Sequence, residues 1–350
     1  MAMTFVFMAS ACGNSAMETE SIDEVTDAKV KIGFSFDSFV LERWTKDRDI
    51  FVSTAVEQGA SVNVQNANGN LATQIEQIKY FIKKKVDVIV IVAVDSNGLS
   101  SVVNEARQNG IKVIAYDRLI HDANIDLYIS FDNEKVGKLM AEALCEATGN
   151  AGKYIMLCGP TTDDNVAKVV SGFNEVTDKT DVNITASMNA DNWRAEEVYE
   201  YLEQHPDVIT DIDGIMCGND NLATQAVRYL AERGLAGSIP VVGQDADLDA
   251  CQRIVEGTQL MTVYKPVEQL AVTAARYAVA LAEDNNYEME NITQNQENVH
   301  LGKLQYNNIS QKYITVEPYS VNKENMDQII IEGGFHLAEE VYLNVNDSIN

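Results

Sequence analysis

The chain contains 350 residues, more than one ordinary domain needs, and 46% of them are hydrophobic, so we expect two folded domains with full cores. Its 53 acidic residues outnumber the 26 basic ones and leave a net charge of −27. Because such a surface repels phosphate backbones, the composition argues against a nucleic-acid partner.

The N-terminal stretch has the pattern of an export signal. MAMTFVFMASAC is an apolar run that ends in small residues and Cys12, which resembles a bacterial lipobox in which Cys12 would be lipidated. Ala9 stands where leucine is usual, and no basic residue precedes the run, so a scar without function is the alternative. We predict a lipoprotein signal and tether over residues 1–28, anchored outside the cytoplasmic membrane through Cys12, or a periplasmic protein if Cys12 is not acylated.

From residue 29 onward, short β-branched runs alternate with amphipathic stretches of helical length. The first series predicts strands at 30–36, 61–65, 87–92 and 112–116, with helices at 42–58, 71–84 and 99–109. The second predicts strands at 153–157, 182–188, 214–217 and 239–242, with helices at 164–177, 192–204, 222–233 and 267–282. This alternation indicates an α/β protein with two doubly wound lobes. The first strand is not followed by the glycine pattern of a dinucleotide site.

Polar and charged side chains follow these strands, at the edge where open α/β sheets bind ligands. They are Asp37, Arg43, Trp44, Asp117, Arg118, Asp163, Asp164, Asn165, Asp191, Asn192, Trp193, Asn219, Asp220, Gln244, Asp245 and Lys265. A single Asp or Asn there is an ordinary helix cap. However, Arg43, Arg118 and Lys265 are poor caps, and both tryptophans of the chain belong to the set.

This mixture of side chains suits a neutral sugar. Each hydroxyl group can donate and accept, so carboxylates, amides and cations can satisfy it from both sides, while indole packs on the apolar ring face. A carboxylate ligand would need unpaired cations, and a phosphate would need a glycine-rich cradle. We therefore interpret Asp117 and Arg118 as a hydrogen-bonding pair aimed into a cleft, and we expect no cofactor.

Two other patterns favour structural interpretations. Asp245, Asp247, Asp249 and Glu256 match the acidic spacing of a calcium loop, but Ala250 occupies the position where the turn needs glycine, so we expect no metal. Cysteines 145, 158, 217 and 251 stand in apolar contexts without C-x-x-C spacing, which favours buried free thiols.

Several long stretches of the chain resemble one family closely. LERWTKDRDIF, VQNANGN, KVIAYDRLI, DLYISFDNEKVG, GQDADL and GTQLMTVYKP are similar to the bacterial D-xylose-binding branch of the ribose/galactose-type periplasmic binding proteins, which serve ABC transporters. The likeness covers residues 30–266 and resumes at IIIEGGFH. It implies two Rossmann-like lobes, joined by three crossovers, that close on one sugar.

The resemblance also implies the positions of the ligand contacts. The sugar-binding residues would be Arg43, Trp44, Asp117, Arg118, Asp164, Asn165, Trp193, Asn219, Asp245 and Lys265. Because GPTTDDNVAK departs from the family's wording, Asp164 could exchange roles with Asp163 or Asn165. We predict an N-terminal lobe of residues 29–132 plus about 265–295, and a C-terminal lobe of 133–264 plus about 296–345.

The expected function is capture of a monosaccharide, D-xylose first and glucose or ribose as alternatives, by a monomeric protein that delivers it to an ABC permease. A sugar sensor that reports to a membrane histidine kinase or chemoreceptor is the alternative. A glycosidase would need two carboxyl groups astride a glycosidic bond. The acids here stand beside cations and amides, which keep them ionised.

Overall fold

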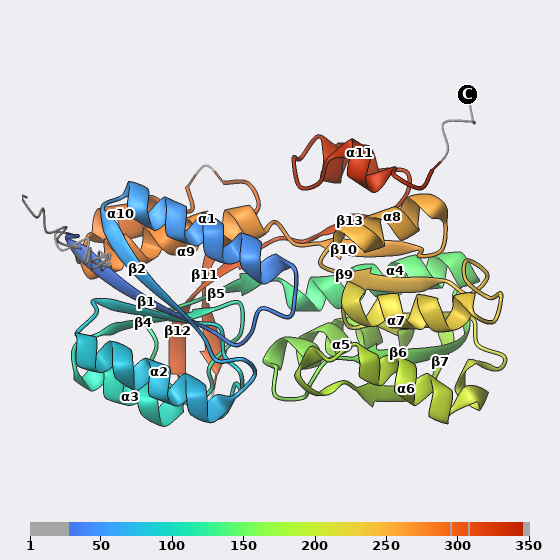
Figure 1. Cartoon of the computed structure of the whole chain (residues 1–350), viewed down its shortest axis with the longest axis horizontal. Coiled ribbons are helices and arrows are strands. Elements are labelled where there is room, and N and C mark those ends of the chain that lie inside the picture. Colours follow the sequence, from blue (N-terminus) through green and yellow to red (C-terminus); the bar gives the residue numbers. More distant parts are fainter. Residues whose placement is uncertain (1–27, 295, 307–308, 346–350) are drawn as a thin grey trace, which may run out of the picture.

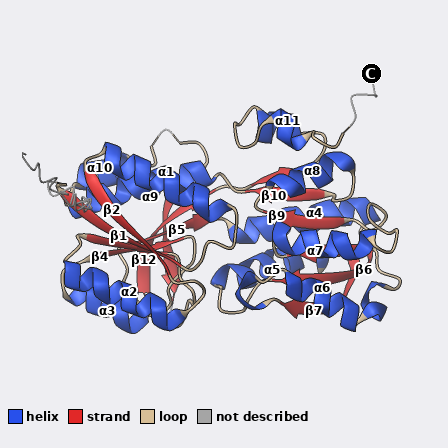
Figure 2. Cartoon of the chain, viewed as in Figure 1, coloured by secondary structure: helices blue, strands red, loops and turns tan. Residues whose placement is uncertain are grey.

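The computed structural model describes residues 28–294, 296–306 and 309–345, and it shows two lobes side by side (Figure 1). Cys12 and almost all of the expected signal and tether lie outside the described residues. In each lobe a sheet is flanked by helices (Figure 2). Within the described part of the chain, no helix is both long and apolar enough to cross a membrane.

The N-terminal lobe is built on a seven-stranded sheet with the order β11-β12-β5-β4-β3-β1-β2. Its strands are β1 (Val30–Phe36), β2 (Ala60–Asn66), β3 (Val88–Ile91), β4 (Lys112–Tyr116), β5 (Leu127–Phe131), β11 (Val299–Tyr306) and β12 (Ile309–Val316). Its main helices are α1 (Arg43–Glu57), α2 (Leu71–Lys84), α3 (Ser100–Gln108) and α9 (Val267–Ala282), followed by the short α10 (Asn286–Asn291). Helices α1 and α9 cover one face of the sheet, and α2 and α3 cover the other (Figure 1). The central strand β3 is therefore buried on both sides, as its sequence VIVI requires.

The C-terminal lobe is built on a six-stranded sheet with the order β13-β10-β9-β8-β6-β7. Its strands are β6 (Ala151–Cys158), β7 (Asp181–Asn189), β8 (Gly214–Cys217), β9 (Val241–Gln244), β10 (Met261–Tyr264) and β13 (Tyr319–Val321). Its helices are α4 (Asn133–Thr148), α5 (Asp164–Thr177), α6 (Glu196–Gln204), α7 (Asp220–Ala231), α8 (Leu248–Glu256) and the short α11 (Ala338–Val341). The four cysteines of this lobe are buried free thiols, as the sequence predicted.

The chain crosses between the lobes three times: from β5 to α4, from β10 to α9 and from β12 to β13. The predicted boundary of the C-terminal lobe is wrong for residues 299–316. Strand β12 pairs in parallel with β5, and β11 pairs with β12, so both strands extend the N-terminal sheet. The hydrogen-bonding edge of β5, about 180 residues earlier, determines this placement, and no local pattern in residues 299–316 reveals it.

The helix expected at 192–204 also begins later than predicted. Residues Asp191–Trp193 form a single 3₁₀ turn, and α6 starts at Glu196. Asn192 and Trp193 have φ angles of 51° and 58°, in the left-handed region that a right-handed helix excludes. This break places Trp193 at the interface of the lobes.

Candidate ligand-binding site

A pocket with about 460 Å³ of empty space, counting the part that is open to solvent, lies between the two lobes at the carboxyl ends of their strands. The wall on the side of the N-terminal lobe is formed by helix α1, the residues after β4 and the crossover after β10. The wall on the side of the C-terminal lobe is formed by the residues at the ends of β6, β8 and β9. Its polar and aromatic lining residues are Arg43, Trp44, Asp117, Arg118, Asn133, Asp163, Asn165, Trp193, Gln244, Asp245 and Lys265.

The structure brings eight of the ten predicted contact residues into this lining: Arg43, Trp44, Asp117, Arg118, Asn165, Trp193, Asp245 and Lys265. Asp164 and Asn219 are not part of it. Asn219 is buried and caps α7, since its Oδ1 accepts from the Leu222 amide at 2.9 Å. Its Nδ2 has no protein partner, and its neighbour Gly218 lines the pocket.

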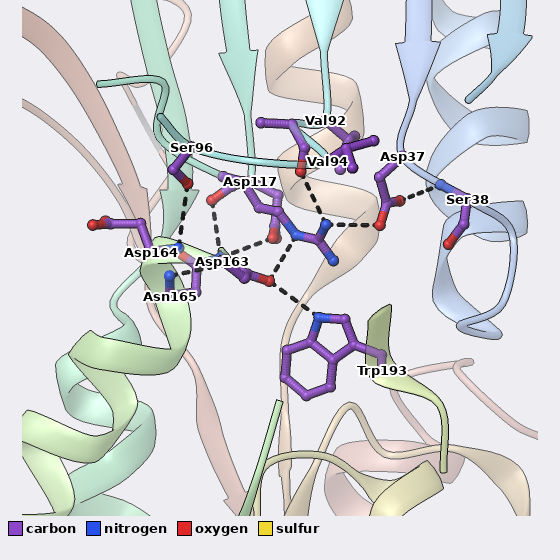
Figure 3. A network of polar contacts seen from close by, with 12 residues as sticks. Asp37, Ser38, Val92, Val94, Ser96, Asp117, Asp163, Asp164, Asn165 and Trp193 are labelled. Atoms are coloured by element: carbon purple, nitrogen blue, oxygen red, sulfur yellow. Dashed lines mark hydrogen bonds and ion pairs between the residues drawn. The ribbon is translucent and has the colours of Figure 1, made fainter. Parts of the chain in front are cut away.

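Asp163 lines the pocket, and Asp164, which was predicted as the ligand contact, does not. Asp163 is the N-cap of α5, and its Oδ1 accepts from the Asn165 amide at 3.0 Å. Asp164 is the first residue of the helix and points away from the Asp163 side chain (Figure 3). Its carboxylate pairs instead with Lys168 at 2.6 Å and with the ring of His121 at 2.9 Å.

Arg118 links the two lobes through buried ion pairs. Its Nη1 lies 2.7 Å from Asp37 Oδ2 and 3.0 Å from the Ala93 carbonyl oxygen, both in the N-terminal lobe. Its Nε lies 2.7 Å from Asp163 Oδ2 in the C-terminal lobe. The indole Nε1 of Trp193 donates to the same Asp163 oxygen at 3.3 Å (Figure 3). One guanidinium therefore holds carboxylates from both lobes at the pocket wall.

Arg43 organises the second group of charges. Its Nη1 lies 3.0 Å from Asp117 Oδ2, and its Nη2 lies 3.2 Å from Asp47 Oδ1 one turn along α1. The Tyr116 hydroxyl also donates to Asp47. The guanidinium of Arg43 lies 4.3 Å from the ring centre of Trp44, which keeps the indole in place by a cation–π contact.

Three lining residues have backbone conformations that side chains disfavour. The φ angles are 64° at Asp117, 58° at Trp193 and 101° at Asp245. Such angles cost free energy and persist where surrounding contacts enforce them, commonly at binding sites. Asp245 is held by Lys265, whose Nζ lies 2.6 Å from its Oδ1.

The pocket charges shift one another's pKa values. Burial opposes ionisation of Asp117, but Arg43, Lys265 and Arg118 together hold its pKa below the ordinary value. Burial raises the pKa of Asp163 and of Asp37, and Arg118 offsets only part of this effect. Of these three carboxylates, Asp117 is therefore the one most firmly held as an anion.

Besides Asp163, sequence reasoning left two polar lining residues, Asn133 and Gln244, out of the contact set. Asn133 begins α4, and its Nδ2 donates to Asn165 Oδ1 at 3.0 Å. Gln244 ends β9, and its Nε2 donates to the Gly218 carbonyl at 2.5 Å while its Oε1 has no protein partner. Gln244 was visible as a strand-exit residue, and the Asp132-Asn133 pair after β5 was the corresponding signal for Asn133.

The acidic loop that resembled a calcium site does not converge on one point. Asp245 pairs with Lys265, whereas Asp249 pairs with Arg253 at 2.5 Å within α8. Over residues 28–345, leaving out those not described, no three His, Cys, Asp or Glu side chains are grouped to hold a metal ion. The polar groups of the pocket instead alternate charged acceptors with charged donors beside two indoles, which suits an uncharged ligand rich in hydroxyl groups.

Comparison with known proteins gives consistent matches. A family model described as periplasmic binding protein domain matches residues 32–286. The chain is 41% identical over 318 residues to the D-xylose-binding periplasmic protein of Escherichia coli (strain K12), covering 89% of this chain and 93% of that protein. It is 39% identical over 321 residues to the protein of the same name from Haemophilus influenzae, covering 89% and 92% respectively.

Solved structures show the same fold at lower identity. An ABC transporter solute-binding protein from Clostridium phytofermentans, with bound β-D-glucose, superposes with a TM-score of 0.75 at 21% identity, covering 89% of this chain and 99% of that one. A periplasmic solute-binding protein from Actinobacillus succinogenes, with bound D-allose, gives a TM-score of 0.73 at 24% identity, covering 86% and 100%. At such identities the likeness extends to the fold alone.

Proposed function

Because the chain belongs to the periplasmic binding protein domain family, we propose that it captures a monosaccharide, D-xylose first, by closing its lobes and delivers the sugar to an ABC importer. The relatives at 41% and 39% identity, both named for D-xylose, support this choice of sugar. Their periplasmic names support a site of action outside the cytoplasm. Acylation of Cys12 and the identity of the permease remain predictions.

The observation that carries the proposal is the inter-lobe pocket itself. Its carboxylates accept from sugar hydroxyl groups, its guanidinium and ammonium groups donate to them, and Trp44 and Trp193 offer apolar surface for the ring. Asp117 and Asp245 come from opposite lobes, so a ligand that contacts both carboxylates favours the closed form.

In this mechanism, the free energy of ligand binding drives the closure of the two lobes. The Arg118–Asp163 pair joins the lobes directly, and a sugar between them adds hydrogen bonds that exist only when the lobes are together. The permease then recognises the closed form. No covalent bond changes in this cycle, and we expect the sugar to be recovered unaltered after release.

Titration calorimetry of the full chain with D-xylose, D-ribose, D-glucose and L-arabinose tests the proposal. We expect micromolar or tighter binding of D-xylose, and we expect Arg118→Met to abolish the heat because two buried carboxylates lose their partner. Lys83→Met, on α2 far along the chain from the lining residues, serves as the control. Absence of heat with all four sugars would contradict the proposal.

A further inference from the structure

The C-terminal segment packs against the turn that presents Asp245 to the pocket. After β13, the chain runs through a helical turn at Asp327–Ile331 to Phe335, His336 and α11, which lies over α8 (Figure 1). Its apolar residues share one buried cluster with α8 and with the Asp245 turn: Ala246, Cys251, Ile254, Val255, Val321, Met326, Ile330 and Val341. The segment is therefore a fixed part of the C-terminal lobe.

His336 holds the backbone of that turn. Its Nε2 lies 2.8 Å from the carbonyl oxygen of Ala246, and its side chain is buried. Burial lowers the pKa of His336, so the ring is neutral and its single N–H is committed to this carbonyl. On the other side of the turn, the Thr262 hydroxyl accepts from the Ala246 amide at 3.1 Å.

The turn needs such support because it is strained. Asp245 and Ala246 have consecutive φ angles of 101° and 55°, although neither residue is glycine. Conformations of this kind persist only where neighbouring contacts enforce them. The His336 bond is one of the contacts that enforce the conformation of the turn, together with the Thr262 bond and the Lys265–Asp245 pair, so its loss weakens the hold on the Asp245 carboxylate.

The same segment also contacts the opposite lobe. The ammonium of Lys46 on α1 donates to the Phe335 carbonyl at 3.3 Å and lies 3.8 Å from the centre of the Phe335 ring. Lys46 is one helical turn beyond Arg43, which lines the pocket. Phe335 in turn packs on Tyr264, next to Lys265, with ring centres 4.8 Å apart. Phe335 thus contacts Lys46 in the N-terminal lobe and Tyr264 in the C-terminal lobe. Its neighbour His336 holds the turn that carries Asp245.

We propose that His336 is a positioning residue for the ligand: it holds the Asp245–Ala246 turn in its binding conformation, and Phe335 joins this turn to Lys46 of the opposite lobe. This inference rests on the proposed sugar-binding function and adds the C-terminal segment to the binding machinery. The segment acts through Asp245 and through closure, without contacting the ligand.

Calorimetry with D-xylose on three variants provides the test. Replacing the imidazole by an apolar side chain in His336→Leu is expected to weaken binding roughly tenfold, since the strained carbonyl loses its donor. His336→Gln, which can place an amide N–H near the same oxygen, is expected to restore most of the affinity. Lys46→Met removes the inter-lobe hydrogen bond from a partly exposed side chain and is expected to weaken binding by about threefold.

A double-mutant cycle separates positioning from general stabilisation. In an Asp245→Asn background, His336→Leu should cost little further affinity, because both changes disable the same contact. His205→Leu is the matched control, since His205 also bonds a backbone carbonyl, Tyr201 O at 2.9 Å, but is exposed and remote from the pocket lining. Equal losses in both backgrounds, or no loss in His336→Leu, would overturn the inference.

Hydrogen exchange of the ligand-free protein keeps this inference separate from the proposed function. The Ala246 amide should exchange faster in His336→Leu than in the wild type and should be unchanged in His205→Leu. If the wild type bound none of the sugars, the proposed function would fail while the exchange result still decided whether His336 holds the turn. Unchanged exchange at Ala246 in His336→Leu would overturn the positioning role.

Discussion

Two adjacent carboxylates, Asp163 and Asp164, have different environments, and this contrast gives the sharpest prediction at the scale of single residues. In Asp163→Asn the helix cap is preserved, because Asn caps as well as Asp does. However, Arg118 and the Trp193 N–H lose a buried anion. We expect D-xylose affinity measured by calorimetry to fall by roughly a hundredfold or more, as for a broken buried ion pair.

The exposed Asp191, which also follows a strand of the C-terminal lobe, provides the control for this change. Asp191→Asn removes one negative charge near the same edge of the sheet and should leave the affinity unchanged. A similar loss in both variants would mean that net charge controls binding and that the Arg118–Asp163 pair does not.

A buried acid outside the pocket lining predicts a pH dependence of stability. Burial raises the pKa of Asp220 from 3.8 to about 7, although Thr262 and Gln259 donate hydrogen bonds to it. Between these values the folded protein holds a proton that the unfolded chain has released. The contribution of this bound proton to the free energy of unfolding is thus complete below pH 3.8 and is lost as the pH rises through 7.

Urea unfolding of Asp220→Asn should reveal this contribution directly. Relative to the wild type, the variant should lose less stability between about pH 4 and 7, by up to roughly 1.4 kcal/mol per pH unit for one proton. Asp211→Asn is the control, because Lys153 lowers the pKa of that exposed carboxyl below this window. Parallel curves for wild type and Asp220→Asn would contradict the assignment.

The types of residue at the strand exits were predictable from the sequence, whereas the directions in which their side chains point were not. Because parallel strands end at one edge of a sheet, the list of polar and aromatic residues after each strand contained ten of the eleven such residues in the observed lining, all but Asn133. Asp164 was misplaced because a shift of one residue at the start of α5 decides which carboxylate caps the helix and which turns outward. Similarity of short sequence stretches to a family identifies the loop, but it does not show which residue of the loop caps the helix.

At the scale of elements, the close packing of α4 on α5 depends on two glycines. A Cβ atom at Gly137 would lie 1.9 Å from the Val169 carbonyl oxygen, and one at Gly172 would lie 1.9 Å from that of Glu134. Neither oxygen can move without its helix, and α5 carries Asp163 and Asn165 into the pocket. Gly172→Ala must therefore separate the helices or distort them.

We expect Gly172→Ala to lower the free energy of unfolding in urea by about 1–3 kcal/mol, the usual cost of overpacking. Gly302→Ala on β11 is the matched control, because a Cβ there meets no atom within 4 Å. If the two substitutions had equal effects, close approach of α4 and α5 would not be the reason for Gly172.

The helices and strands were predictable where capping and periodicity agree. The expected bounds of α2, α5 and α9 coincide with the observed ones, and Asn70 and Asp163 cap the first two. The hairpin β11–β12 could not be assigned to a lobe from the sequence, because its strands would have the same residue pattern in either sheet. Only the pairing of β12 with β5 settles the lobe to which they belong.

At the scale of the whole molecule, contacts outside the pocket also join the lobes. The Ser96 amide donates to the Thr162 carbonyl at 3.0 Å, and the Asp164 amide donates to Ser96 Oγ at 3.3 Å. Beside them, His121 Nε2 of the N-terminal lobe lies 2.9 Å from Asp164 Oδ1. These residues touch each other across the cleft without lining the pocket, so they stabilise closure without selecting the ligand.

This arrangement predicts a change in kinetics without a change in specificity. Asp164→Ala and His121→Ala should each speed sugar release several-fold, with the double variant little faster than either, because each removes the same inter-lobe contact of about 1 kcal/mol. Stopped-flow tryptophan fluorescence can follow release, since both tryptophans, Trp44 and Trp193, lie at the pocket. The ranking of the four sugars should be unchanged.

Lys138→Ala, which breaks a pair with Glu175 inside one lobe, is the control and should release sugar at the wild-type rate. An altered sugar ranking in Asp164→Ala would instead place that carboxylate in contact with the ligand.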